Sequence, residues 1–142
     1  MWKLNAIAGE NSPGHLSRHR TVDLLGRACA AYGDLITQRL SSTDAVIVSD
    51  LSRLECRVKP MRDGNTALLD DFDRFFSESV SEVVALSRGV IDRATEIRSR
   101  YSFKTPDAIH LAAATLSNCE VFLTNDSRLD RFTDVAVEAL TT

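Results

Sequence analysis

The sequence predicts an α/β fold in which short parallel strands alternate with helices on both faces of a sheet. From residue 44 onward, short apolar runs alternate with longer segments whose apolar residues recur every three or four positions. Strands separated by helices in this way are typical of parallel β-α-β units. The 142 residues, 44% of them hydrophobic, suffice for one core. We therefore expect a single domain over residues 1–142.

The first predicted strand of this pattern is followed by two helices. Residues 44–50, DAVIVSD, contain a β-branched run, and Ser49 and Asp50 at its end are good helix N-caps. Residues 51–58 then predict a short helix. Residues 65–77 predict an amphipathic helix, because their apolar positions have the i, i+3, i+4 spacing of one helix face. These apolar positions are Leu68, Leu69, Phe72, Phe75 and Phe76.

The second half of the chain repeats the alternation. Residues 80–86, VSEVVAL, predict a strand, and residues 90–101 return to helical spacing. A further helix is predicted in KTPDAIHLAAATL, with Thr105 as its N-cap and Pro106 at its first helical position. The last strands are predicted at residues 119–123 and 135–140.

The net charge and the distribution of basic residues limit how the protein could bind nucleic acid. The net charge of −3 argues against a protein that coats nucleic acid through a global positive field. Two local basic clusters are either solvated faces or positive surfaces. Their members are Arg53, Arg57, Lys59 and Arg62 in one, and Arg93, Arg98 and Arg100 in the other.

The cysteines and the hydropathy pattern predict where the protein works. Cys29, Cys56 and Cys119 are odd in number and lack zinc-ligand spacing, so we expect free thiols in a reducing compartment. No apolar run is long enough to cross a membrane, and the N-terminus lacks the apolar core of a secretory signal. We therefore expect a cytoplasmic protein without a membrane span.

Two aspartates lie where functional groups gather in an open parallel sheet, beyond the carboxyl ends of strands and at helix N-termini. Asp107 is predicted at the second position of its helix, where free N–H groups and the helix dipole favour its charge. Asp126 follows the apolar run of its strand. Each also has an ordinary explanation, as a helix start and as part of an Asn-Asp turn.

Glu55 interrupts an apolar pattern. Leu51, Leu54, Glu55 and Val58 have i, i+3, i+4, i+7 spacing, so the glutamate is predicted to face inward. A buried carboxylate needs neutralisation, a basic partner or a cation. Neither nearby arginine lies at i±3 or i±4 from it, so its own helix supplies no partner.

If Glu55, Asp107 and Asp126 converge, their mutual repulsion requires a cation between them. No set of histidine or cysteine ligands accompanies these acids, so a hard divalent ion, Mg²⁺ or Mn²⁺, fits best. Such an ion can activate water and bind the oxygens of a phosphodiester, which is nuclease chemistry. His110, one turn after Asp107, is interpreted mainly as a packing or hydrogen-bonding residue, with a ligand or base as the alternative.

The motifs TPDAIHLAAA and VFLTNDSRL, with SDLSRLECRV upstream, resemble the PIN domain family, and in particular the VapC-like toxin ribonucleases of type II toxin–antitoxin systems. The resemblance covers roughly residues 34–140. It implies a three-layer α/β/α domain with a central parallel sheet. It also implies a Mg²⁺- or Mn²⁺-dependent endoribonuclease that a cognate antitoxin inhibits.

The same resemblance assigns roles to individual residues. It implies that Glu55, Asp107 and Asp126 are the catalytic acids and bind the metal. It implies further that Thr124 and Asn125 support Asp126, and that the basic residues near Glu55 hold RNA phosphates.

The N-terminal segment departs from the family pattern. Members of the family usually open with a hydrophobic strand that ends in an aspartate, a central metal ligand. Here WKLNAIAGENSPG offers Asn5, RTVDLLGRA offers Asp23, or the acid is absent. Residues 1–33 are atypical of the family, although a helix is plausible over residues 22–40.

Two functions follow from this pattern. The first is an RNA-cleaving toxin with a metal bound by carboxylates. The alternative is a catalytically impaired PIN-like protein that acts by binding antitoxin or RNA. The aromatic residues of LLDDFDRFF are either core or a surface for a homodimer or an antitoxin helix.

Overall fold

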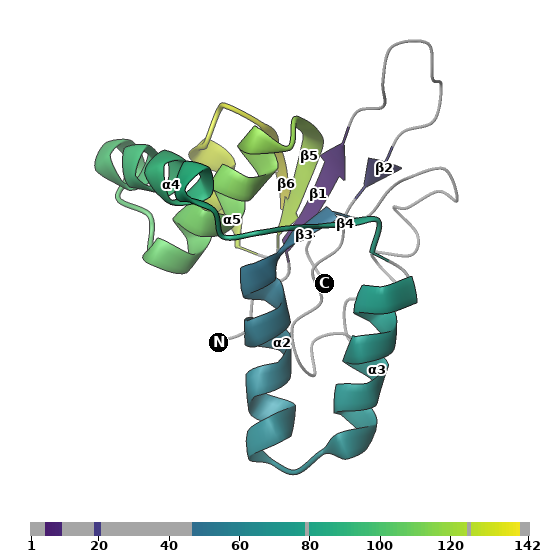
Figure 1. Ribbon diagram of the computed structural model, residues 1–142. Coiled ribbons are helices and arrows are strands. Elements are labelled where there is room, and N and C mark those ends of the chain that lie inside the picture. The colour runs from purple at the N-terminus through teal and green to yellow at the C-terminus, as the bar shows by residue number, and fades with distance from the viewer. Residues whose placement is uncertain (1–4, 10–18, 21–46, 79, 125, 140–142) are drawn as a thin grey trace.

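The computed structural model describes residues 5–9, 19–20, 47–78, 80–124 and 126–139, and Figure 1 shows their arrangement. For residues 5–9 and 19–20 it describes the backbone alone. In chain order, the described elements are β1 (Asn5–Gly9), β2 (His19–Arg20), β3 (Ile47–Ser49), α2 (Asp50–Arg62), α3 (Thr66–Glu78), β4 (Glu82–Val84), α4 (Arg88–Tyr101), α5 (Thr105–Leu116), β5 (Cys119–Thr124), the 3-10 helix η1 (Ser127–Arg131) and β6 (Ala136–Ala139).

From residue 47 onward, the predicted strands and helices are confirmed, with small shifts at their ends. The largest difference is α2, which continues to Arg62, four residues beyond the predicted end at residue 58. α5 begins at Thr105 itself, and its N-cap is Lys104, so the predicted capping position was wrong by one residue. The predicted helix over residues 22–40 lies outside the described residues.

The strands pair in both directions, so the prediction of a central parallel sheet holds in part. β3 pairs with β4, and β5 with β6, in parallel, as predicted. β1 lies between β2 and β5 and runs antiparallel to both, which gives the order β2-β1-β5-β6 in that described sheet. Alternating strands and helices predict parallel pairing only for strands that a helix connects. β1 can pair in the antiparallel direction because its backbone N–H and C=O groups are hydrogen-bonded equally well in that direction.

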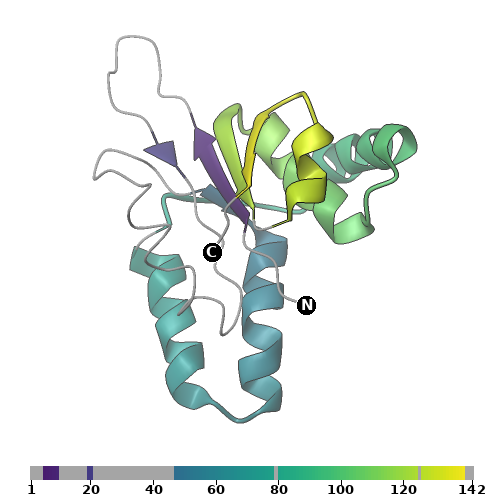
Figure 2. The ribbon, with the colours of Figure 1, turned by 180° about the vertical axis from the view of Figure 1, so that it is seen from behind.

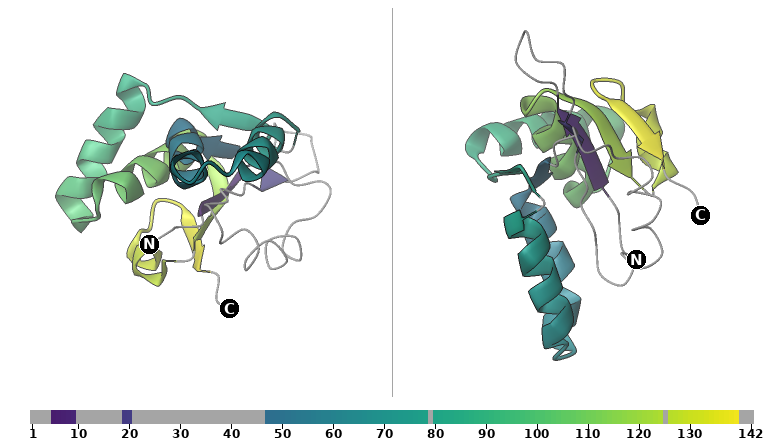
Figure 3. Two further views of the ribbon diagram at one scale, coloured as in Figure 1. Left: turned by 90° about the horizontal axis from the view of Figure 1, so that it is seen from below. Right: turned by 90° about the vertical axis from the view of Figure 1, so that its right-hand side faces the viewer.

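The described helices form one layer and one arm. α5 packs against β5 and β3, and α4 packs on α5 (Figure 1). Figure 2 shows this α4–α5 layer from behind, to one side of β5 and β6. α2 and α3 form a hairpin that extends away from the strands, as the right-hand view of Figure 3 shows. Of the predicted three layers, the described residues therefore supply the strands and one helical face.

Among the described residues, two apolar clusters hold these parts together. The larger lies between α4, α5, β5 and η1, and the smaller joins β3 to the α2–α3 arm. Phe72 and Phe76 belong to the smaller cluster, with Val48 and Cys56, so their interpretation as core residues is confirmed. The fully buried residues of the larger cluster include Leu111, Ala112, Ala114 and Phe122.

α2 buries a different face from the one that its sequence predicted. Its buried residues are Ser52, Cys56 and Pro60, which have i, i+4, i+8 spacing. Leu54 and Val58, predicted to face inward, are 62% and 48% exposed, and Met61 is 58% exposed. The prediction was wrong because α2 meets α3 through the face that carries Cys56, which packs with Phe72 and Phe76, and apolar spacing does not tell which face of a helix meets its neighbour. We call Leu54, Val58 and Met61 the α2 apolar stripe.

The described cysteines and helices agree with the sequence expectations. Cys56 and Cys119 are free thiols, and burial raises the pKa of the Cys119 thiol to about 12. A thiol with so high a pKa is a poor nucleophile at neutral pH. Cys29 lies outside the described residues. None of the described helices is long and apolar enough to cross a membrane.

Candidate functional site

Asp107 lies in the first turn of α5 and is only 3% exposed. Pro106 precedes it near the start of the helix, where a missing N–H costs no hydrogen bond. The free N–H groups and the dipole of this helix end favour a negative charge at Asp107. The predicted position at a helix start is confirmed.

Asp126 follows β5 directly and is 7% exposed. Its backbone N–H donates to Thr124 Oγ1 at 3.0 Å, a contact that agrees with the supporting role which the family resemblance implies for Thr124. One carboxylate oxygen, Oδ1, accepts the Arg128 backbone N–H at 3.0 Å and thereby caps η1. Asn125 lies outside the described residues. The aspartate is therefore a turn residue, and it is also held in one orientation.

Arg128 binds the same carboxylate with its side chain. Its Nε donates to Asp126 Oδ1 at 2.9 Å, and its Nη2 donates to Oδ2 at 2.7 Å. These hydrogen bonds, the charge of Asp126 and a smaller effect of Asp107 raise the pKa of Arg128 above its ordinary value. The two buried aspartates thus act on one guanidinium, although Asp107 and Asp126 are 19 positions apart in the sequence.

Glu55 has a different partner, His110 of α5. His110 Nε2 lies 2.6 Å from Glu55 Oε1, and His110 Nδ1 lies 3.0 Å from Ser49 Oγ. Ser49 and His110 are almost fully buried, whereas the Glu55 side chain is 23% exposed. The interpretation of His110 as a hydrogen-bonding residue is confirmed, and Glu55 has the basic partner that its own helix does not supply.

The basic residues next to Glu55 form ion pairs with other acids rather than with Glu55. Arg53 and Arg57 both pair with Asp73 of α3, at 3.5 Å and 3.0 Å. Lys59 pairs at 2.8 Å with Asp63, the C-cap residue of its own helix. These ion pairs link or border the α2–α3 arm, which favours the solvated-face interpretation of this basic cluster.

Comparison with known proteins identifies the family. The model of the PIN domain family matches residues 14–135. The chain belongs to the PIN domain family. Among solved structures, it is similar to a toxin–antitoxin complex from Klebsiella pneumoniae, with a TM-score of 0.54 and 19% identity. That match covers 75% of this chain and 82% of the other, and at this identity it supports the fold alone. A search of curated proteins found no match.

The acids of this PIN domain have the chemistry of a divalent-metal site. Glu55, Asp107 and Asp126 offer only carboxylate oxygens, the donors that Mg²⁺ and Mn²⁺ prefer. In the part of the chain that the structure describes, however, no three histidine, cysteine or acidic side chains are grouped closely enough to hold an ion. Glu55 contacts His110, and Asp126 contacts Arg128. The donor set fits the metal, and its convergence on one ion stays a prediction.

The structure places one of the two candidates for the first acid of the PIN domain. In the β1–β5 ladder, Asn5 is the backbone partner of Thr124, two residues before Asp126. The backbone of Asn5 therefore lies beside the strand end that carries Asp126. Asp23 lies outside the described residues.

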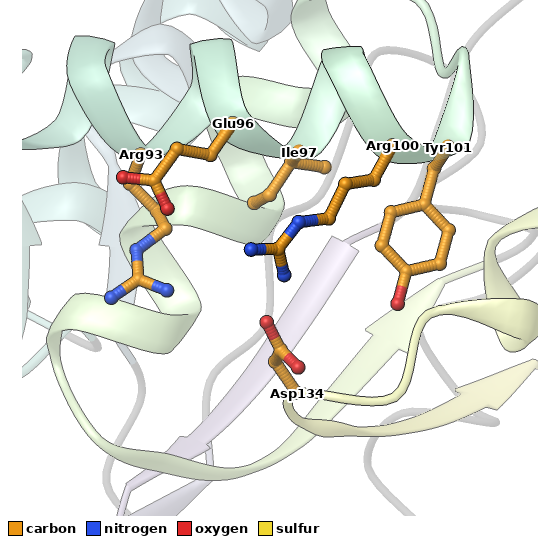
Figure 4. Close-up of a pocket in the computed structure, with 6 residues that line it drawn as sticks. All are labelled: Arg93, Glu96, Ile97, Arg100, Tyr101 and Asp134. Carbon is orange, nitrogen blue, oxygen red and sulfur yellow. The ribbon is translucent and has the colours of Figure 1, made fainter.

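A separate pocket lies between α4 and the segment before β6 (Figure 4). It encloses about 180 Å³, part of it open to solvent, and carries charges of both signs. Its lining residues are Arg93, Glu96, Ile97, Arg100, Tyr101 and Asp134. None of the predicted site residues lines it, so we do not assign it to the site.

Sequence reasoning missed two contributors to this site. Arg128 stands two residues after Asp126, a spacing that allows a local Arg–Asp pair at a turn. That spacing was a usable signal. Ser49 was predicted as a helix cap, and it occupies the N-cap position of α2 without a side-chain capping bond. Its hydroxyl contacts His110 across 61 positions of sequence, for which no local pattern exists.

Proposed function

We propose that this PIN domain is a Mg²⁺- or Mn²⁺-dependent endoribonuclease, the VapC-like toxin of a toxin–antitoxin pair in the cytoplasm. The observation that carries the proposal is the burial of two aspartates, Asp107 and Asp126, that act on one guanidinium. Two buried carboxylates at a helix N-terminus and a strand end need positive charge, and a divalent ion would supply it. Membership in the PIN family supports nuclease chemistry.

Asp107 and Asp126 would hold the ion, and Glu55 is proposed as the third acid. When bound, the ion supplies a nucleophilic water and stabilises charge on the scissile phosphate. The protein's own groups do the positioning. Thr124 and the N–H of Arg128 fix the orientation of Asp126, and the α5 N-terminus favours the charge of Asp107. The Arg128 side chain is largely exposed beside the acids, where its guanidinium can bind an RNA phosphate.

The proposed partner is an antitoxin protein, and a homodimer is a further proposal. The similar solved structure is a toxin–antitoxin complex, which supports this class of partner. The α2 apolar stripe supports it as well, because Leu54, Val58 and Met61 lie exposed on one helix face next to Glu55. An amphipathic antitoxin helix laid on this stripe would also cover Glu55.

The test is cleavage of a labelled RNA pool by purified protein with Mn²⁺ and with EDTA. Asp107→Asn and Asp126→Asn should each lose at least roughly 100-fold in rate, the upper range for partners just outside a metal's ligand shell. The matched control is Asp130→Asn, an exposed acid in η1, which should cleave like wild type. Cleavage that persists in EDTA, or in both aspartate variants, contradicts the proposal.

A second function is favoured by the sequence of β1. This strand, NAIAG, contains no acid, whereas the first strand of the family usually ends in an aspartate. The candidate Asn5 is the first residue of the strand and carries an amide. An amide is a neutral and weaker ligand for a hard cation. A PIN domain that binds RNA or antitoxin without cleaving would bind the same RNA pool equally well with and without Mn²⁺, and would leave it intact.

A further inference from the structure

We propose that His110 is a positioning residue that holds Glu55, and that Ser49 fixes the orientation of the His110 ring. The inference rests on the proposed function, because Glu55 is proposed there as a metal-site acid. The three side chains come from the end of β3, from α2 and from α5. They form a continuous hydrogen-bonded chain with distances of 3.0 Å and 2.6 Å. We call it the Ser49–His110–Glu55 chain.

The hydrogen positions in this chain follow from its end groups. An ionised carboxylate only accepts hydrogen bonds, so the short contact to Glu55 places a proton on His110 Nε2. At the other end, the Ser49 hydroxyl either donates to Nδ1 of a neutral ring or accepts from Nδ1 of a charged one. The chain is therefore complete in both states of the ring. A hydroxyl is suited to this position because it can take either role.

The Ser49 hydroxyl contacts His110 and makes no side-chain capping bond to α2. It occupies the N-cap of α2, where a serine side chain usually accepts from a backbone N–H two or three residues later. Here it makes no such capping bond. Its hydroxyl is fully buried and contacts His110 instead. A cap that is left unused beside a long-range bond indicates that the bond to the ring matters more than the local one.

The exposed fraction rises along the Ser49–His110–Glu55 chain, which indicates that the two buried residues hold the glutamate. Ser49 and His110 are 0% and 1% exposed, whereas the Glu55 side chain is 23% exposed. The two inner residues are packed in place, and the glutamate reaches the surface with one oxygen fixed. Because the contact with His110 uses Oε1, we assign Oε2 as the oxygen that would bind a ligand.

His110 also ties Glu55 to the element that carries Asp107. His110 and Asp107 both belong to α5, three positions apart on one helix face. A contact from His110 to Glu55 therefore couples the position of α2 to that of Asp107. Without it, the glutamate would have three free torsions, and a metal ion would have to order them on binding. The expected consequence of losing His110 is weaker metal binding.

The test compares two amide substitutions of His110. In His110→Gln the amide nitrogen replaces Nε2 and can still donate to Glu55, whereas in His110→Asn the amide lies near Nδ1 and reaches only Ser49. Mn²⁺ titration monitored by electron paramagnetic resonance should show His110→Asn binding roughly 10–100-fold more weakly than wild type. His110→Gln should retain most of the affinity. Equal melting temperatures of the two variants would confirm that packing is matched.

A double-mutant cycle with Glu55→Gln isolates the route of the effect. If His110 acts only through Glu55, adding His110→Asn to Glu55→Gln should cause no further loss of Mn²⁺ affinity. If His110→Asn weakens Mn²⁺ binding as much in the Glu55→Gln variant as it does in wild type, the positioning role is overturned. Equal affinity of His110→Asn and wild type overturns it as well.

A readout without metal separates this inference from the proposed function. Imidazole ¹⁵N spectra of the full chain should show His110 protonated at Nε2, and Glu55→Gln should shift that resonance. An Nε2 without a proton in wild type overturns the chain directly. If wild type binds no Mn²⁺, the proposed function fails, and with it the site role of the chain. In that case a protonated Nε2 would leave only the hydrogen-bonded geometry established.

Discussion

Glu55 and Asp126 are both acids with a basic partner, but the partners differ in burial and freedom. The partner of Glu55 is His110, which is 1% exposed and is itself fixed by Ser49. The partner of Asp126 is Arg128, whose side chain is 59% exposed. In the first pair the base is buried and the acid reaches solvent. In the second pair the acid is buried and the base reaches solvent.

The difference teaches which partner can be exchanged. A buried imidazole with bonds on both nitrogens cannot leave without exposing unsatisfied groups, so it acts as a fixed support. An exposed guanidinium can leave the pair once another cation takes its place at the buried carboxylate, because water hydrates the released guanidinium. Arg128 therefore neutralises Asp126 when no other cation is present. A divalent ion or an RNA phosphate would compete for one side of that pair.

The largest expected effect is on stability. His110→Ala should lower the free energy of unfolding by about 3 kcal/mol, because it leaves a cavity and strips Ser49 and Glu55 of a partner. Arg128→Ala should cost less, about 1 kcal/mol, because the lost side chain is largely exposed and Asp126 keeps the hydrogen bond from the backbone N–H of residue 128. Urea unfolding followed by circular dichroism measures both. Equal destabilisation by the two substitutions would remove the distinction between a fixed and an exchangeable partner.

A smaller effect is expected on metal affinity. Arg128→Ala removes a positive charge that contacts both oxygens of Asp126, so Mn²⁺ should bind several-fold more tightly. Arg128→Lys, which keeps the charge but loses the bidentate contact, should fall between Arg128→Ala and wild type. Isothermal titration calorimetry at low and high salt measures the difference.

The same variant gives a second readout, on RNA. If Arg128 binds a phosphate once it is displaced, Arg128→Ala should raise the KM for RNA while its Mn²⁺ affinity improves. Weaker Mn²⁺ binding by Arg128→Ala would mean that the arginine supports the metal site rather than competing for it.

The two pairs also differ in how far the sequence could predict them. Asp107 and Asp126 follow from local patterns, because a Thr-Pro-Asp helix start and an acid after an apolar strand are each readable within a few residues. The Arg128 contact spans two residues and is local as well. The His110 contacts span 55 and 61 positions and depend on how α2 and α5 pack, which no window of sequence contains.

Glu55 itself was selected by an argument that the fold contradicts. The pattern of Leu54 and Val58 predicted an inward-facing stripe, and both residues are exposed. The glutamate has a basic partner because α5, rather than its own helix, supplies it. Amphipathic spacing gives the face of a helix that is apolar, and it does not reveal whether that face meets the core or a partner protein.

The strand directions show the same limit at the level of the sheet. Helix-connected segments from residue 47 onward predicted the parallel pairs β3–β4 and β5–β6. The antiparallel pairing of β1 with β5 could not be predicted, because NAIAG has little hydrophobic pattern and no helix signal links it to a parallel partner.

The smallest expected effect concerns a third kind of pair, in which the acid and both bases are partly exposed. Asp73 lies between Arg53 and Arg57, and its side chain is 45% exposed. Asp73→Asn should cost about 1 kcal/mol of stability, because the side chains are partly exposed although Arg57 Nε and Asp73 Oδ1 are buried where they meet. It should leave Mn²⁺ affinity unchanged. The matched control is Asp71→Asn, which removes another exposed ion pair of α3, with Arg74.

RNA binding decides whether this third pair matters for function. Asp73→Asn frees two guanidinium groups on α2, so RNA affinity should rise slightly and fall more steeply with salt than in wild type. Asp71→Asn should not show this change, because Arg74 belongs to α3 rather than to α2, the helix of Glu55. Filter binding of the RNA pool across a salt series measures both slopes. Identical slopes in Asp73→Asn, Asp71→Asn and wild type would mean that Arg53 and Arg57 serve the α2–α3 arm alone, and that RNA approaches the acids from the Arg128 side.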